Sequence, residues 1–103
     1  MTRGEVWWVE DPAAGARPHV VLTRDTAIAV IHSVIVAPAT RTSRGIPTEV
    51  HLGVADGMPD ECVVSLDNTT LMPKAFLRER ICVLGPDRMS EICEALAIAT
   101  GCR

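Results

Sequence analysis

The sequence predicts a mainly β fold, a small twisted barrel of short strands with a single α-helix at its C-terminal end. Short runs rich in β-branched and aromatic residues follow one another along the chain, separated by glycine, proline and aspartate. Only after residue 84 does the apolar pattern change to a helical period. The length of 103 residues, 48% of them hydrophobic, suits one compact domain, so we expect a single domain over residues 1–103.

The N-terminal segment predicts a β-hairpin. Residues 5–10, "EVWWVE", read as a strand, and the following "DPAAGARP" contains the proline and glycine of a turn. The second strand is expected over residues 19–23, because Pro18 has no N–H to donate and therefore belongs at the beginning of a strand. This boundary places Arg17 at the rim of the loop.

The middle of the chain alternates strands with polar loops. Residues 24–33 fit either a short helix or an extended lead-in, and "SVIVAPAT" then predicts a strand that stops at Pro38, with Thr40 emerging at its end. A polar loop over residues 41–47 follows. Further strands are expected over residues 48–52 and 61–67, with Asp67 at the exit of the second.

The C-terminal part predicts a single helical turn at residues 73–77, a strand over residues 80–84 and then the helix. Proline is favoured at the first helical position and glycine just past the end, so Pro86 and Gly101 mark its limits. An apolar stripe on this helix is expected to pack against the barrel or a partner subunit; its residues are Met89, Ile92, Cys93, Leu96 and Ala97.

Charge and cysteine usage exclude several classes of protein. The formal net charge of −3 argues against a protein that simply coats nucleic acid, although the arginines are separate from the acidic clusters and allow one basic face. The four cysteines lie in apolar segments without CxxC spacing, which favours reduced structural thiols over disulfides. No histidine and cysteine spacing is typical of a metal site, so no metal is expected.

The chain has no apolar run of the roughly 18–20 residues that cross a bilayer, and its N-terminus lacks the apolar segment of a signal peptide. We therefore expect a cytoplasmic protein without a membrane association.

Three polar residues occupy comparable positions, because Arg17, Thr40 and Asp67 each lie at or just past an expected strand end. Rigid strands can present such side chains to a common groove. Each also has a local explanation, as a solvated loop cation, a turn hydroxyl and the first residue of an Asx turn. Spacing alone leaves both interpretations open.

The order of several short segments resembles the MazF/PemK toxin family over nearly the whole chain. These segments are "RGEVWWVEDP", "RPHVVLTRD", "VIVAPAT", "RGIPTEV", "VVSLDNTT" and "MSEICEALAIATG". The resemblance implies an SH3-like barrel of the MazF/PemK/CcdB type that forms a homodimer. It also implies the toxin of a type II toxin-antitoxin system, a sequence-specific endoribonuclease that needs no metal or other cofactor and is neutralised by a cognate MazE-like antitoxin.

The resemblance also implies roles for individual residues. Arg17 and Thr40 match the catalytic arginine and threonine of the family, and Asp67 with Asn68 matches an acidic-amide pair that holds substrate and can transfer a proton. In such a site the RNA 2'-hydroxyl attacks phosphorus and leaves a 2',3'-cyclic phosphate and a 5'-hydroxyl, while a guanidinium clamps the nonbridging oxygens. RNA contacts are also expected from the loop residues Arg41, Thr42, Ser43 and Arg44.

The chain departs from the family pattern at two places. The first hairpin loop is shorter than usual, and Thr70 stands where many members have a second arginine, so the partner in proton transfer stays open. His19 could titrate near neutrality, but its place just inside a strand favours packing. Trp7 and Trp8 point to opposite faces of one strand, so one is expected in the core while the other can stack on a base.

Two other functions are compatible with such a barrel. The fold also resembles CcdB, a toxin that binds and inhibits DNA gyrase without cleaving anything, and a small structural barrel could recruit another protein. Neither would need Arg17 and Thr40 to converge on one phosphate, so substituting these two residues separates the classes.

Overall fold

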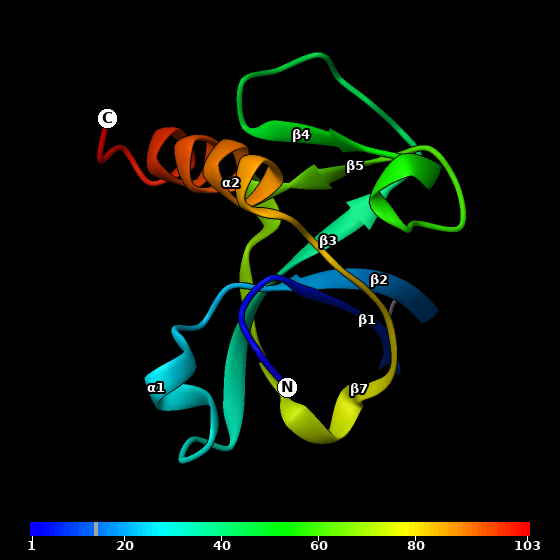
Figure 1. Ribbon diagram of the computed structural model, residues 1–103, viewed down its shortest axis with the longest axis vertical. Helices are drawn as coiled ribbons and strands as arrows, with labels where there is room; N and C mark the ends of the chain where they lie inside the picture. Colours follow the sequence, from blue (N-terminus) through cyan, green and yellow to red (C-terminus); the bar gives the residue numbers. More distant parts are fainter. Residues whose placement is uncertain (14) are drawn as a thin grey trace.

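The computed structural model describes residues 1–13 and 15–103, which form seven strands and two α-helices (Figure 1). The elements in chain order are β1 (Glu5–Asp11), β2 (Gly15–Val21), α1 (Asp25–Ile28), β3 (Ser33–Thr40), β4 (Glu49–Leu52), β5 (Cys62–Ser65), β6 (Thr70–Pro73), β7 (Leu77–Val83) and α2 (Pro86–Ala99). Single 3₁₀ turns cover Val54–Asp56, Leu66–Asn68 and Lys74–Phe76.

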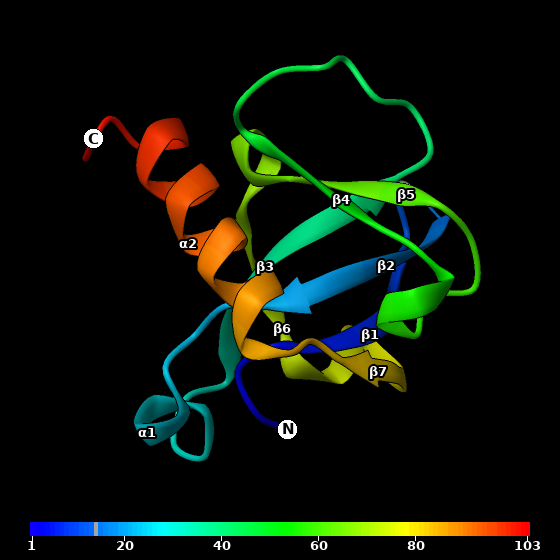
Figure 2. The same cartoon turned by 45° about the horizontal axis from the view of Figure 1, so that its top comes forward.

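The strands pair antiparallel in the order β4-β5-β3-β2-β1-β7, and β6 adds to β3. Strand β3 joins the two halves of the sheet: residues 33–36 pair with β6, and Ala39 and Thr40 pair with β5. Figure 2 shows the sheet bending strongly about β3, with α2 beside β4 and β5. The prediction of a mainly β fold with a C-terminal helix is confirmed.

Two apolar clusters fill the interior. One lies between β1, β7 and the N-terminal half of β3 and includes Val9, Val34 and Leu77. The other lies under α2, where Met89, Ile92 and Ala95 pack against the strands. Cys93, expected on the packing stripe, is instead exposed, because each helical residue turns by about 100° and Cys93 is carried out of the buried face centred on Ile92.

The expected limits of the second strand of the first hairpin and of β3 are wrong, in both cases next to a proline. Strand β2 begins at Gly15, so Arg17 lies inside a paired strand, opposite Val9, and not on a loop rim. Proline is tolerated there because, among the described residues, this end of β2 pairs with β1 alone and pairing with β3 begins at His19. Likewise β3 runs past Pro38 to Thr40, because Pro38 sits where the strand changes partners from β2 to β5.

In the C-terminal part the helical turn and the helix agree with the prediction, whereas the strands do not. The helical turn at residues 74–76 and helix α2 lie where the pattern predicted them, and Gly101 has the positive φ of 73° that glycine favours after a helix. Strand β6 was not predicted, and β7 starts three residues earlier than expected, at Leu77.

The four cysteines are free. Cys62 and Cys82 are half-buried, and burial raises the pKa of both thiols, so they act as structural groups. Cys93 and Cys102 are exposed, contrary to the expectation that all four pack as apolar residues. In the part of the chain that the structure describes, no helix is long and apolar enough to span a membrane.

Candidate active site

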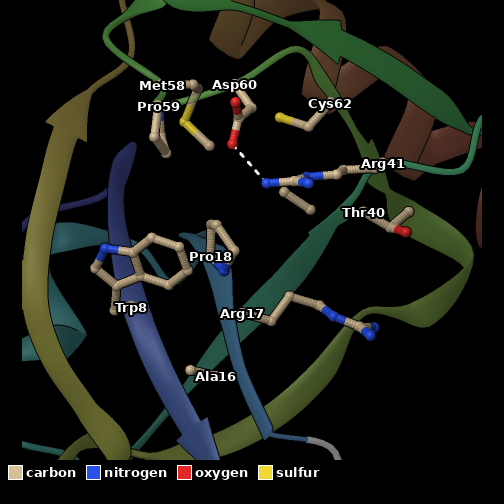
Figure 3. A pocket seen from close by; sticks show the side chains of 11 residues that line it. Trp8, Ala16, Arg17, Pro18, Thr40, Arg41, Met58, Pro59, Asp60 and Cys62 are labelled. Carbon is tan, nitrogen blue, oxygen red and sulfur yellow. Dashed lines mark hydrogen bonds and ion pairs between the residues drawn. The ribbon is translucent and has the colours of Figure 1, made fainter.

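Two neighbouring clefts open beside the ends of β2 and β3, and both are lined by Arg17 and Thr40. The smaller, about 150 Å³, is the polar cleft; its other lining residues include Thr42, Arg44, Asp67 and Asn68. The larger, about 320 Å³, is the tryptophan cleft; its other lining residues include Trp8, Pro18, Arg41, Pro59 and Asp60 (Figure 3). The shared residues make the two clefts parts of one site.

Strand β2 positions Arg17. Its Cα lies opposite Val9 of β1, so the backbone of this residue is fixed by the sheet while its side chain is exposed. Figure 3 shows the guanidinium extending from β2 toward the side on which Thr40 lies. Among the described residues no carboxylate pairs with this guanidinium, which therefore retains all five N–H donors for a ligand.

Thr40 is the last residue of β3 and its Cα lies opposite Val63 of β5. Its Oγ1 accepts a hydrogen bond from the Thr42 amide at 3.3 Å, which orients the side chain at the start of the loop. A hydroxyl that accepts one such bond still has its own proton to donate. Thr40 can therefore donate to an anion bound beside Arg17.

Asp67 lies in the 3₁₀ turn Leu66–Asn68, because β5 ends at Ser65, two residues before the strand exit that the sequence predicted at Asp67. The buried Thr48 donates a hydrogen bond of 2.6 Å from its hydroxyl to Asp67 Oδ2. The adjacent Asn68 donates from its side-chain amide to Ser65 Oγ at 2.8 Å. Both side chains are thus held, Asp67 by the residue before β4 and Asn68 by the last residue of β5, and Asp67 lines the polar cleft with a second carboxylate oxygen that has no partner among the described residues.

The loop between β3 and β4 is organised by Glu49, which the sequence analysis did not single out. The Glu49 carboxylate accepts hydrogen bonds from the backbone amides of Arg44 and Gly45, both at 3.0 Å, and from the Ser43 hydroxyl at 3.4 Å. Desolvation acts to raise the pKa of Glu49, but these amide donors together hold it below its usual value. The available signal was the glutamate of "RGIPTEV", which follows Gly45 by four residues and Pro47 by two.

The structure brings most of the predicted site residues together. Six of them line the polar cleft: Arg17, Thr40, Thr42, Arg44, Asp67 and Asn68. Arg41 instead lies in the tryptophan cleft, where it pairs with Asp60 at 2.7 Å. Ser43 lines neither cleft, and its hydroxyl donates to the Glu49 carboxylate at 3.4 Å.

His19 supports Arg17 from within the sheet. Its side chain is buried, and Nδ1 lies 3.0 Å from the Arg17 carbonyl oxygen, to which it donates in the tautomer with the proton on Nδ1. Burial lowers the pKa of His19 below its usual value, so the ring is neutral near pH 7. The packing interpretation of this residue agrees with its burial.

The chemistry available at the polar cleft is that of an anion site. A free guanidinium and a hydroxyl provide donors, and a carboxylate lies in the same cleft. Among residues 1–13 and 15–103, no group of three or more histidines, cysteines and carboxylates is arranged to hold a metal ion.

Comparisons with known proteins agree with this arrangement. Residues 2–100 match the family described as PemK-like, MazF-like toxin of type II toxin-antitoxin system. The "Probable endoribonuclease MazF2" of Mycobacterium tuberculosis is 43% identical over 103 residues, covering 99% of this chain and all of that protein. The "Endoribonuclease MazF3" of the same species is 37% identical, covering 82% of each chain.

A solved structure has the same fold over the full length. It is an endoribonuclease in complex with its cognate antitoxin from a mycobacterial species, with a TM-score of 0.91 and 29% identity, covering 100% of this chain and 97% of that one. The match to the family extends over almost every residue, including both clefts. This chain therefore belongs to the PemK-like, MazF-like family of toxins of type II toxin-antitoxin systems.

Proposed function

We propose that this protein is the endoribonuclease toxin of a type II toxin-antitoxin pair and cleaves single-stranded RNA at the polar cleft without a metal ion. The observation that carries the proposal is the joint lining of one cleft by the Thr40 hydroxyl, the Asp67 carboxylate and the guanidinium of Arg17, which has no carboxylate partner among the described residues. Relatives at 43% and 37% identity that carry the name endoribonuclease support it.

In the proposed reaction the scissile phosphate binds between Arg17 and Thr40. The RNA 2'-hydroxyl loses its proton to the Asp67 carboxylate, and its oxygen forms a bond to the adjacent phosphorus. The bond from phosphorus to the 5'-oxygen of the next nucleotide breaks, and that oxygen takes a proton from solvent. The products are a 2',3'-cyclic phosphate and a free 5'-hydroxyl.

Arg17 contributes most where charge develops. Negative charge grows on the nonbridging oxygens in the transition state, and a guanidinium can donate two parallel hydrogen bonds to them. Thr40 adds a third donor. Because Thr48 already holds one oxygen of Asp67, the carboxylate needs little reorganisation to accept the proton.

The proposal includes the assembly in which the toxin acts. We expect a two-fold homodimer in the cytoplasm that inhibits translation and growth by cutting RNA. A MazE-like antitoxin is expected to lay an acidic segment across Arg17 and the 41–47 loop, so that its carboxylates take the place of RNA phosphates. The solved complex of a mycobacterial endoribonuclease with its antitoxin supports this partner.

The decisive experiment is to incubate the purified protein with total RNA and to sequence the newly formed 5'-hydroxyl ends. We expect ends that share a short sequence, with matching 2',3'-cyclic phosphates. RNA that stays intact in the presence of folded protein would contradict the proposal and would direct attention to a noncatalytic toxin that binds its target. The same experiment identifies the class of RNA that is cut.

A further inference from the structure

We propose that the tryptophan cleft binds an unpaired guanine base adjacent to the scissile phosphate, stacked on Trp8 and hydrogen-bonded to Asp60 and Arg41. The inference rests on the proposed function, because it names a feature of the substrate at the same site. Neither Trp8 nor Asp60 belongs to the polar cleft, so their contribution is separable from the cleavage chemistry.

The cleft has the size and walls of a site for a flat ring. Its volume of about 320 Å³ is within the range of pockets that enclose small ligands. Trp8 lies directly opposite Pro18 in the β1–β2 pair, and Figure 3 shows both facing the space below Met58 and Pro59. Aromatic side chains bind unpaired bases by stacking, whatever the base.

Only one of the two tryptophans is placed for this role. The Trp7 indole N–H donates to Glu5 Oε1 at 2.8 Å, and its ring packs against an interior cluster. Trp8 is half-buried, lines the tryptophan cleft and makes no side-chain hydrogen bond among the described residues. Trp8 therefore presents part of its side chain to the cleft, and its indole N–H has no hydrogen-bond partner in the part of the chain that the structure describes.

The end of the cleft above the tryptophan is polar. Arg41 Nη2 donates to Asp60 Oδ2 at 2.7 Å, while Asp60 Oδ1 and the remaining Arg41 donors have no partner among the described residues. The pair thus offers carboxylate acceptors next to guanidinium donors. Guanine is the base whose Watson–Crick edge has two adjacent N–H donors, N1–H and N2–H, beside the O6 acceptor, so it fits this pair best.

The position of the cleft links the base to the reaction. Because Arg17 and Thr40 line both clefts, a phosphate bound to them lies at the mouth of the tryptophan cleft. The base of a nucleotide attached to that phosphate can then enter the tryptophan cleft while the RNA backbone stays bound at Arg17 and Thr40. Recognition of this base and positioning of the phosphate would occur together.

The first test is cleavage of a randomised single-stranded RNA pool, followed by sequencing of the new 5'-hydroxyl ends. The wild-type protein is expected to enrich guanine at one position beside the cut. Asp60→Asn should lower that enrichment by about 5- to 150-fold, because an amide cannot accept two hydrogen bonds from guanine, and each bidentate contact discriminates by this amount. Glu94→Gln is the matched control, since it removes an equally short and exposed ion pair, to Arg103, on the far helix.

A second measurement does not depend on cleavage. Guanosine 3'-monophosphate should quench the tryptophan fluorescence of the wild type at lower concentrations than the adenosine, cytidine and uridine monophosphates do, and Asp60→Asn should remove the difference. Trp8→Phe, which retains a smaller aromatic face, should weaken the binding of all four nucleotides; calorimetry measures binding for this variant, because it lacks the indole whose fluorescence is quenched.

The outcomes distinguish the inference from the proposed function. If no RNA is cut but guanosine 3'-monophosphate binds preferentially, the endoribonuclease proposal fails and the guanine site stands. If RNA is cut and neither guanine enrichment nor preferential quenching occurs, the guanine site is wrong. Normal cleavage preferences in Asp60→Asn and Trp8→Phe, combined with weaker inhibition by the antitoxin, would overturn it in favour of a peptide side chain as the occupant.

Discussion

The hydroxyl of Thr48 donates a 2.6 Å hydrogen bond to Asp67 Oδ2 and so joins the residue before β4 to the turn after β5. Thr48 is buried, whereas the carboxylate that it holds is exposed and lines the polar cleft. The fold thereby fixes the direction of a carboxylate that the proposed reaction uses to remove a proton.

The first prediction concerns this contact. Thr48→Val should lower single-turnover RNA cleavage by about 10-fold, because a hydrogen bond to a charged group contributes roughly 1.5–3 kcal/mol and part of that is recovered by water. Thr69→Val is the matched control, since its hydroxyl bonds to the Leu66 carbonyl oxygen in the same turn and does not touch Asp67. Equal cleavage by wild type and Thr48→Val would remove Thr48 as a positioning residue.

The carboxylate itself should matter more. Asp67→Asn keeps the shape and the hydrogen bond to Thr48 but cannot take a proton, so we expect a loss of about 100- to 10,000-fold in the single-turnover rate. The pH dependence of the cleavage rate gives the second readout. A general base makes the rate fall at low pH as it becomes protonated, and this fall should disappear in Asp67→Asn. An unchanged fall at low pH would indicate that another group accepts the proton.

The loop next to this site should respond to pH through Glu49. A lowered pKa means that the ionised carboxylate stabilises the folded loop; this contribution is complete above the ordinary value of 4.5 and is lost as pH falls through the lower folded-state pKa. The amide resonances of Arg44 and Gly45 should therefore shift together on acidification below pH 4.5. In Glu49→Gln the joint shift should be absent; a shift that persists would assign the effect to another group.

The elements of the fold were predictable from the sequence to different degrees. The pattern predicted the hairpin, most strands and helix α2, because turn residues and a change of hydrophobic period are local signals. The strand limits near Pro18 and Pro38 could not be predicted in this way. Whether a strand can contain proline at these positions depends on which neighbouring strand pairs there, and that is a long-range property. Strand β6 has four residues and, in the described part of the chain, pairs with β3 alone, so its existence depends on a long-range partner.

The same distinction applies to the site. Arg17, Thr40 and Asp67 were proposed from their order in the chain, and they do line one cleft. Glu49 and Asp60 were not proposed, because no local sequence signal shows their contacts. The Glu49 carboxylate accepts hydrogen bonds from the amides of the 41–47 loop, and Asp60 forms an ion pair with Arg41, 19 residues earlier in the chain. Ser43 could not be separated from Arg44 by sequence, since only the folded loop directs its hydroxyl to Glu49.

Metal removal tests the proposed chemistry as a whole. The proposed reaction uses an arginine, a hydroxyl and one carboxylate, and no group of three or more metal-binding side chains occurs among the described residues. Cleavage should therefore continue at an unchanged rate in excess EDTA. Loss of cleavage in the chelator with restoration by magnesium would replace the arginine clamp with metal-assisted chemistry.

Arg17 provides the sharpest prediction, because it lines both clefts and its guanidinium has no carboxylate partner in the part of the chain that the structure describes. Arg17→Ala should slow single-turnover cleavage by about 100- to 1000-fold, the usual effect of removing donors to a developing oxyanion. Arg17→Lys should recover little of this rate, since an ammonium keeps the charge but not the planar pair of donors.

Stability separates this catalytic effect from a structural one. The Arg17 side chain is exposed, so both variants should unfold within about 0.5 kcal/mol of the wild type. Arg24→Ala is the matched control, because Arg24 is also an exposed arginine but lines neither cleft, and it should cleave at the wild-type rate. Near wild-type cleavage by a folded Arg17→Ala protein would show that the phosphate is held elsewhere, and the reaction would then have to be assigned to different residues.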